Sequence, residues 1–139
     1  MSKLYDWPRR YSEFIAEART TPFKWFDHDC VTFAAKALDA QYDFNLMQVI
    51  AQDYAYQDAE GAQLMIARHG GLEQLVTEVL DIEPIPPGYL TTGDAVLYAY
   101  GQEGFAHALA VHDGHQLLIP GAEGIVSLHV GRALKGWRP

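Results

Sequence analysis

Hydrophobic residues recur every three to four positions through the first 80 residues, which is the spacing of amphipathic helices. Trp7-Pro8 opens the first helix, with proline near the first helical position. Asp58 is placed to cap a later helix, and His69-Gly70-Gly71 is typical of a helix end and restart. The pattern predicts five helices, at residues 7–19, 30–40, 45–52, 59–68 and 72–80.

The hydrophobic pattern changes after residue 80. Pro84, Pro86 and Pro87 forbid a helix and impose an extended connector. Apolar residues then alternate with a period of two, and Asp113-Gly114 signals a tight hairpin turn. We predict strands at residues 95–100, 105–112, 115–119, 125–130 and 133–137, with Pro120-Gly121 breaking the third.

A helical first half followed by antiparallel strands indicates an α+β fold. We expect a single domain over residues 1–139, with a helical part (1–80), a connector (81–92) and a sheet (93–139). The helix that begins at Cys30 should pack across the sheet.

Composition narrows the classes of partner. The chain carries a formal net charge of -8 over 139 residues and has no basic run, which argues against nucleic acid. A single cysteine allows no internal disulfide. The N-terminus has no apolar signal core and no stretch is long enough to cross a bilayer, so we expect no signal peptide and no membrane insertion.

The only cysteine, Cys30, follows Asp29, a preferred helix N-cap residue. Cys30 should therefore lie in the first turn of a helix, where backbone N–H groups and the helix dipole lower a thiol pKa. The alternative is a small core residue, because free cysteines are often buried. The polar segment Asp27-His28-Asp29 and the aromatic lead-in favour the wall of a groove; the aromatic residues are Phe23, Trp25 and Phe26.

Among the six histidines, His107 is the best candidate partner for Cys30. Strand alternation places it on the same face as Leu109 and Val111, which we expect to pack on the helices. A buried imidazole within reach of the thiol would form a thiolate–imidazolium pair and hold the thiol pKa below roughly 8.5. The alternative is a strand histidine satisfied by backbone groups.

The turn at Asp113-Gly114 brings His112 and His115 close together. Metal ions are usually held by three or four ligands at defined spacing, and no second cluster is evident. We therefore expect no metal and no other cofactor.

Several segments, taken in order, carry a family resemblance. They are Trp7 with Arg9-Arg10-Tyr11, Phe23 to Cys30, Ala34-Ala35, Gly70-Gly71, Gly93 to Leu97, and Ala133 to Arg138. Asp-Cys at a helix start, Gly-Asp before an antiparallel sheet and a strand histidine together resemble the NlpC-type papain-like cysteine peptidases. In its details the chain more closely resembles a phage- and prophage-encoded branch of that superfamily, a domain family of unknown function.

The sequence departs from the pattern of those enzymes at three places. Val31-Thr32 stand where Ser-Gly is usual, and Ile119-Pro120 stand where a third catalytic polar residue lies. Ala108-Leu109-Ala110 follow the histidine where Val-Gly-Ile is typical, and a shifted register would remove the histidine match. The resemblance therefore implies the fold more firmly than the activity.

The resemblance implies two alternative functions in a phage tail. The first is a cysteine hydrolase that cleaves peptide bonds of the bacterial cell wall. Cys30 would attack the carbonyl carbon and His107 would transfer the proton. Asp29 and Asp113 are candidates for supporting the oxyanion or orienting the imidazole.

The second function is a non-enzymatic structural or assembly protein of the tail tip with a degraded active site. Tyr42, Tyr54 and Tyr56 would then form a docking surface, unless they are ordinary packing residues. The expected partners are other tail or baseplate proteins, or peptidoglycan peptide. The expected location is the virion, or the host cytoplasm during assembly.

Overall fold

The computed structural model describes residues 2–139, with the helices before the strands. The helices are α1 (Trp7–Ala18), α2 (Cys30–Asp39), α3 (Leu46–Asp53), α4 (Ala59–Arg68) and α5 (Leu72–Leu80). The strands are β1 (Ala95–Gln102), β2 (Phe105–His112), β3 (Gln116–Gly121), β4 (Gly124–His129) and β5 (Ala133–Trp137). Two short 3-10 turns, η1 (Pro87–Tyr89) and η2 (Val130–Arg132), lie before β1 and before β5. The predicted α+β fold is confirmed, and within residues 2–139 no strand precedes residue 81.

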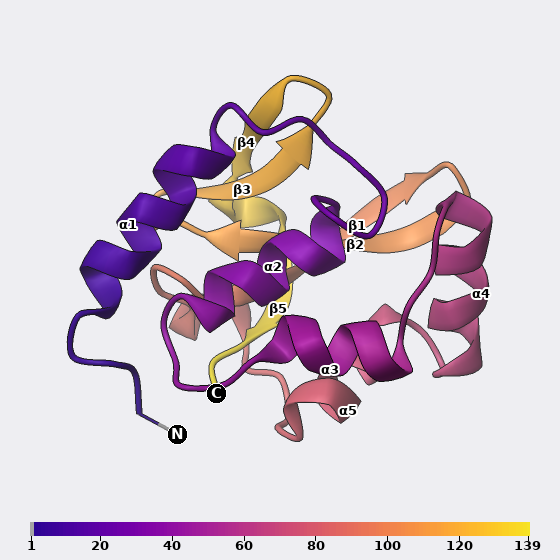
Figure 1. The fold of residues 1–139 in the computed structure, drawn as a ribbon, viewed down its shortest axis with the longest axis horizontal. Coiled ribbons are helices and arrows are strands. Elements are labelled where there is room, and N and C mark those ends of the chain that lie inside the picture. Colours follow the sequence, from indigo (N-terminus) through magenta and orange to yellow (C-terminus); the bar gives the residue numbers. More distant parts are fainter. Residues whose placement is uncertain (1) are drawn as a thin grey trace.

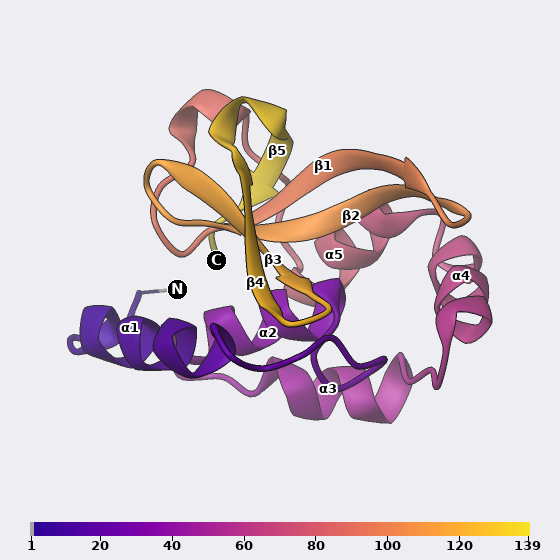
Figure 2. The same cartoon turned by 90° about the horizontal axis from the view of Figure 1, so that it is seen from above.

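The five strands form one antiparallel sheet in the order β4-β3-β2-β1-β5 (Figure 1). Viewed from above, α1, α2 and α3 form a layer along one face of the sheet, and the β1–β2 hairpin reaches toward α4 (Figure 2). Neighbouring strands in the sequence pair with each other except β4 and β5, which lie at opposite edges. In Figure 2 the β1–β2 hairpin extends past α2 toward α4.

The two faces of the sheet bury separate hydrophobic clusters. The helix-facing cluster joins residues of α2 to the alternate strand residues Leu97, Leu109 and Val111. The opposite cluster contains Val96, Tyr98, Ala108, Ala110, Leu117 and Leu90. Cys30 packs against both clusters, so the start of α2 contacts hydrophobic residues of each.

Strand β3 is longer than the sequence predicted, because Pro120 does not break it. Pro120 pairs with Ile125 of β4, whereas β3 pairs with β2 only through Leu117 and Leu118. The edge of β3 beside Pro120 therefore has no β2 partner, and proline is tolerated at an unpaired strand edge.

The Gly93-Asp94 motif joins the helical layer to the C-terminal segment. Gly93 has a φ of 94°, and its carbonyl accepts a hydrogen bond from the fully buried Gln41 (Nε2 to O, 2.8 Å). A Cβ atom at Gly93 would lie 2.2 Å from Gln41 Oε1, so no side chain fits there. Asp94 is buried and pairs with Arg138 through contacts of 3.0 and 2.7 Å. The motif therefore has a structural role here.

Candidate functional site

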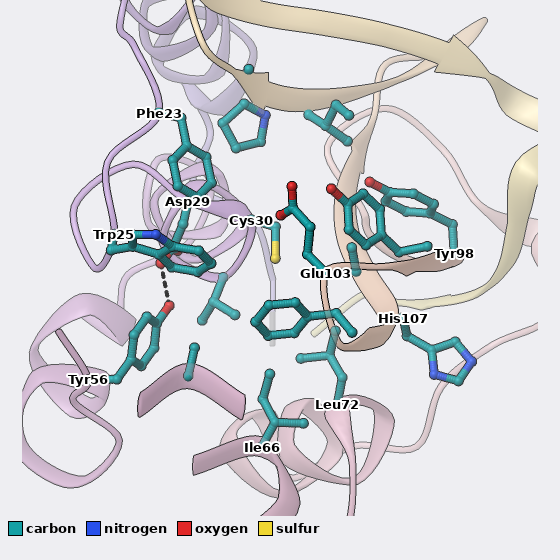
Figure 3. A pocket seen from close by; sticks show the side chains of 18 of the residues that line it. Phe23, Trp25, Asp29, Cys30, Tyr56, Ile66, Leu72, Tyr98, Glu103 and His107 are labelled. Carbon is teal, nitrogen blue, oxygen red and sulfur yellow. Dashed lines mark hydrogen bonds between the residues drawn. The ribbon is translucent and has the colours of Figure 1, made fainter. Parts of the chain in front are cut away.

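A cavity of about 400 Å³ opens beside the thiol of Cys30 (Figure 3). It lies among the start of α2, the loop before it, the β1–β2 hairpin, β3, α4 and α5. Its wall is mostly aromatic and aliphatic, and its polar side chains are few. The residues that line it include Phe23, Trp25, Asp29, Cys30, Tyr56, Tyr98, Tyr100, Glu103, Phe105 and His107. A cavity of this size falls within the range of about 300–1,000 Å³ that is typical of ligand pockets.

Cys30 stands at the wall of this cavity because α2 begins there. The Asp29 side chain accepts a hydrogen bond from the Thr32 backbone N–H (2.9 Å), and the Thr32 hydroxyl oxygen accepts one from the Asp29 backbone N–H (2.9 Å). This reciprocal pair is a capping box, which fixes the first turn of the helix. Thr32 therefore has a structural role at the start of α2.

The carboxylate of Asp29 is used entirely within the protein. Oδ1 accepts hydrogen bonds from the backbone N–H and the hydroxyl of Thr32, and Oδ2 accepts from the Phe26 N–H (2.9 Å) and the Tyr56 hydroxyl (2.5 Å). The side chain is 1% exposed. A carboxylate has about four lone-pair sites, and these four contacts occupy them. Asp29 thus ties the preceding loop and the post-α3 segment to α2, and the structure gives it no free oxygen for an oxyanion or an imidazole.

The thiol of Cys30 is held in its neutral form. Burial and, to a lesser extent, the neighbouring Asp29 carboxylate raise the pKa of Cys30 to about 12, although hydrogen bonds from backbone amides, including that of Leu109, oppose the shift in part. No histidine of the described residues contributes to the pKa shift of Cys30. The sequence led us to expect a lowered pKa, and the structure gives the opposite direction. The helix N-terminus does favour the anion, but the loss of hydration outweighs it.

His107 lines the same cavity as Cys30, but it is exposed, and Figure 3 shows its ring directed away from the Cys30 sulfur. Strand alternation does place it on the face of Leu109 and Val111, and those two residues are buried against the helices. His107 lies nearer the tip of the hairpin, beyond the part that α2 covers. The expectation of a buried imidazole facing the thiol is therefore wrong for this conformation.

Asp113 lies at the opposite end of β2 from His107. Asp113 follows His107 by six positions, which corresponds to about 20 Å along a strand. Asp113 Oδ1 instead accepts a hydrogen bond from the Tyr11 hydroxyl of α1 (2.9 Å). The structure thus does not bring Asp113 to the imidazole, and the residue anchors α1 to the end of β2.

The expected docking surface of three tyrosines is not present. Tyr42 is 2% exposed and Tyr56 is 7% exposed, and both belong to the helix-facing cluster. Tyr54 is partly buried and donates a hydrogen bond to Glu78 (2.9 Å). Polar loop neighbours suggested exposure, but the hydroxyl of Tyr56 finds a buried partner in Asp29. Ordinary packing accounts for these residues.

Three polar residues of the cavity were missed from the sequence: Tyr98, Tyr100 and Glu103. Tyr98 and Tyr100 lie on β1, and burial raises the pKa of Tyr98 to about 12, so its hydroxyl stays protonated. Glu103 lies in the β1–β2 turn with a φ of 54°, followed by Gly104 with a φ of 84°. The turn itself was predicted between residues 101 and 104, and that placement is the one signal for Glu103.

Gln63 of α4 fixes the turn that carries Glu103. Its Nε2 donates a hydrogen bond to the Glu103 carbonyl (2.8 Å), and a Cβ at Gly104 would lie 2.3 Å from that nitrogen. The hairpin tip is thereby held against α4, and the carboxylate of Glu103 points into the cavity (Figure 3). Within residues 2–139 this carboxylate makes no ion pair or hydrogen bond.

Within the described part of the chain, no group of three or more His, Cys, Asp or Glu side chains is arranged to hold a metal ion. His112 Nδ1 accepts a hydrogen bond from the Gly114 backbone N–H (3.1 Å). None of the helices in residues 2–139 is long and apolar enough to span a membrane.

The fold and site define an α+β domain in which a helix-start cysteine opens onto an aromatic cavity. The chain belongs to the family described as Domain of unknown function (DUF6950), whose model matches residues 2–139. No curated protein matches the sequence.

Proposed function

We propose that this chain is a phage tail-associated domain of the NlpC-like type that binds a ligand in the Cys30 cavity without cleaving it. The observation that carries the proposal is the environment of the thiol. Burial and a carboxylate raise its pKa to about 12, and no imidazole of the described chain opposes them. A neutral thiol is a poor nucleophile near pH 7, whereas an aromatic cavity with a few polar groups is typical of a binding site.

The phage setting and the NlpC-like descent are supported by the sequence resemblance described above. In that setting the ligand is presented by another tail or baseplate protein, or by a peptide of the cell wall, and the domain is carried in the virion. Two observations test this part of the proposal. Mass spectrometry of purified virions should detect the protein, and the genes beside its own should encode phage tail proteins. A metabolic operon around the gene and absence from the particle would contradict this part.

The absence of thiol activation is tested by alkylation of Cys30 with iodoacetamide across pH. We expect labelling to be slow near neutral pH and to show no midpoint near the ordinary thiol pKa of about 8.5, because the folded environment favours the neutral thiol. His107→Ala should leave the profile unchanged, as should the control His115→Ala at another exposed position. A midpoint below about 8.5 that rises in His107→Ala but not in His115→Ala would overturn the proposal.

A cysteine hydrolase is the second candidate, and one observation favours it. Cys30 and His107 line the same cavity, and His107 is exposed, so its ring is not held in place by packing. Catalytic contacts often tighten only when substrate binds. Cell-wall tetrapeptide incubated with the wild type and with Cys30→Ser separates the two functions. Cleavage by the wild type alone would establish the hydrolase.

A further inference from the structure

The side chains that line the Cys30 cavity include a free carboxylate and hydroxyl groups but no lysine or arginine of the described residues. Glu103 contributes a carboxylate that has no partner within residues 2–139, and Tyr98 and Tyr100 contribute hydroxyl oxygens. None of the lysine or arginine side chains in residues 2–139 lines the cavity. Arg132 contacts the ring of Tyr98, 5.6 Å from its centroid, but it is not part of the wall. The cavity thus offers hydrogen-bond acceptors and lacks a cation.

The walls of the cavity add to this preference. Phe23 packs edge-on against Trp25 at 4.9 Å between centroids, and Trp25 stacks on Phe105 at 6.0 Å. The π faces of aromatic rings carry a partial negative charge and attract cations, with tryptophan the strongest. An aromatic wall also accepts aliphatic chain. A ligand with an aliphatic stem and a positive head would therefore match both parts of the cavity.

We propose that the Cys30 cavity binds a primary alkylammonium group of the lysine type, with its aliphatic stem against the aromatic wall and its ammonium facing Glu103. An ammonium presents three hydrogen-bond donors and no acceptor, which suits a site of carboxylate and hydroxyl oxygens. The cavity of about 400 Å³ is large enough for such a side chain together with its backbone. This inference names the ligand class of the proposed function and rests on it.

The direct test compares two ligands that differ only in the ammonium. Nα-acetyl-lysine N-methylamide carries it, and Nα-acetyl-norleucine N-methylamide has a similar aliphatic chain without charge. We expect the lysine derivative to bind about five- to twentyfold more tightly at low salt, and the difference to shrink as salt is added. Titration with indole N–H detection by NMR locates the site, because Trp25 lines the cavity while Trp7 and Trp137 do not.

Matched variants assign the preference to Glu103. Glu103→Gln removes the charge and should abolish the preference for lysine over norleucine. Glu17→Gln removes an equal charge from α1, outside the cavity, and should leave the preference within about twofold of the wild type. Trp25→Leu should weaken both ligands and reduce their difference, and Phe105→Leu provides a second wall variant in case Trp25→Leu fails to fold.

The inference is overturned if the two ligands bind equally, if neither binds, or if Glu17→Gln reduces the preference as much as Glu103→Gln does. These outcomes are distinct from failure of the proposed function. A low, His107-dependent thiol pKa or cleavage of cell-wall peptide would overturn the non-catalytic role while leaving ammonium selectivity measurable.

Discussion

The start of α2 and the tip of the β1–β2 hairpin both line the Cys30 cavity, yet they differ in how their polar groups are used. At the start of α2, every acceptor of Asp29 is filled by Thr32, Phe26 and Tyr56. At the hairpin tip, Glu103 and His107 are exposed and form no hydrogen bond or ion pair through their side chains with the described residues. Side chains whose hydrogen bonds are all made within the protein stabilise the fold. Side chains that make no hydrogen bond or ion pair within the protein are available to bind a ligand.

The same contrast extends to the second acidic motif. Asp94 belongs to the Gly-Asp motif that contributes to the family resemblance in the sequence. In the structure it pairs with Arg138 and accepts a hydrogen bond from the Thr91 backbone N–H (2.8 Å). Both aspartates of the Asp-Cys and Gly-Asp motifs therefore act mainly in folding.

Asp29→Ala should cost the most stability. It leaves the Tyr56 hydroxyl and two backbone N–H groups without their buried acceptor, and it removes the helix cap. We expect a loss of about 3–5 kcal/mol in the free energy of unfolding, measured by chemical denaturation. Asp27→Ala, at an exposed position two residues earlier, should change stability by less than about 0.5 kcal/mol. A stable Asp29→Ala protein with altered thiol reactivity would show that Asp29 serves the site instead.

Arg138→Ala should be the next most damaging change, because it leaves the buried Asp94 carboxylate without its cation. We expect a loss of about 2–4 kcal/mol. Lys135→Ala is the matched control, since its contact with Glu73 is a surface pair at 3.1 Å and should be worth less than about 1 kcal/mol. Equal losses for both variants, measured by denaturation, would contradict a structural role specific to Asp94.

The fold should lose stability on mild acidification through His28. Burial and the neighbouring Lys36 lower the pKa of this residue, while Asp27 and Asp29 oppose the shift, and its Nε2 has no hydrogen-bond partner in the described structure. Below pH 6.5 the unfolded chain takes up a proton that the folded chain resists, so stability is full above pH 6.5 and falls as the pH decreases. The slope is at most about 1.4 kcal/mol per pH unit for each such group.

The pH effect is measured by urea denaturation between pH 4.5 and 7.5. Burial also lowers the pKa of His112, so a part of the slope should remain in His28→Gln. The exposed control His115→Gln should retain the full slope. An unchanged slope in His28→Gln would mean that this buried histidine does not resist protonation.

Glu103→Gln should have the smallest effect on stability. The carboxylate makes no contact with the described residues that the amide would lose, and the backbone contact with Gln63 is retained. We expect a change within about 0.5 kcal/mol, measured by the same denaturation experiment. A loss comparable to that of Asp29→Ala would remove the distinction between the two regions.

The order and type of the helices and strands could be predicted from the sequence alone. Side chains three and four apart share a helix face, and alternate residues share a strand face, so the periods 3.6 and 2 were readable locally. Asp29 as the cap of α2, the turn near Glu103 and the strand at residues 105–112 all follow from such local rules. The prediction that Pro120 breaks the third strand was wrong. A strand can contain proline where no neighbouring strand needs its backbone N–H, and the sequence does not show where β2 stops pairing with β3.

The tertiary structure alone decided which of these residues meet. His107 and Leu109 share a strand face, but one is exposed and the other buried, because α2 covers only part of the hairpin. Tyr56 can be buried because the Asp29 carboxylate, 27 residues away in the sequence, accepts a hydrogen bond from its hydroxyl. The state of the Cys30 thiol depends on burial by segments distant in the sequence, and a pKa sums desolvation and charge over all of them. Local patterns fix the direction of a side chain from its own element, whereas its burial and partners depend on where the other elements pack.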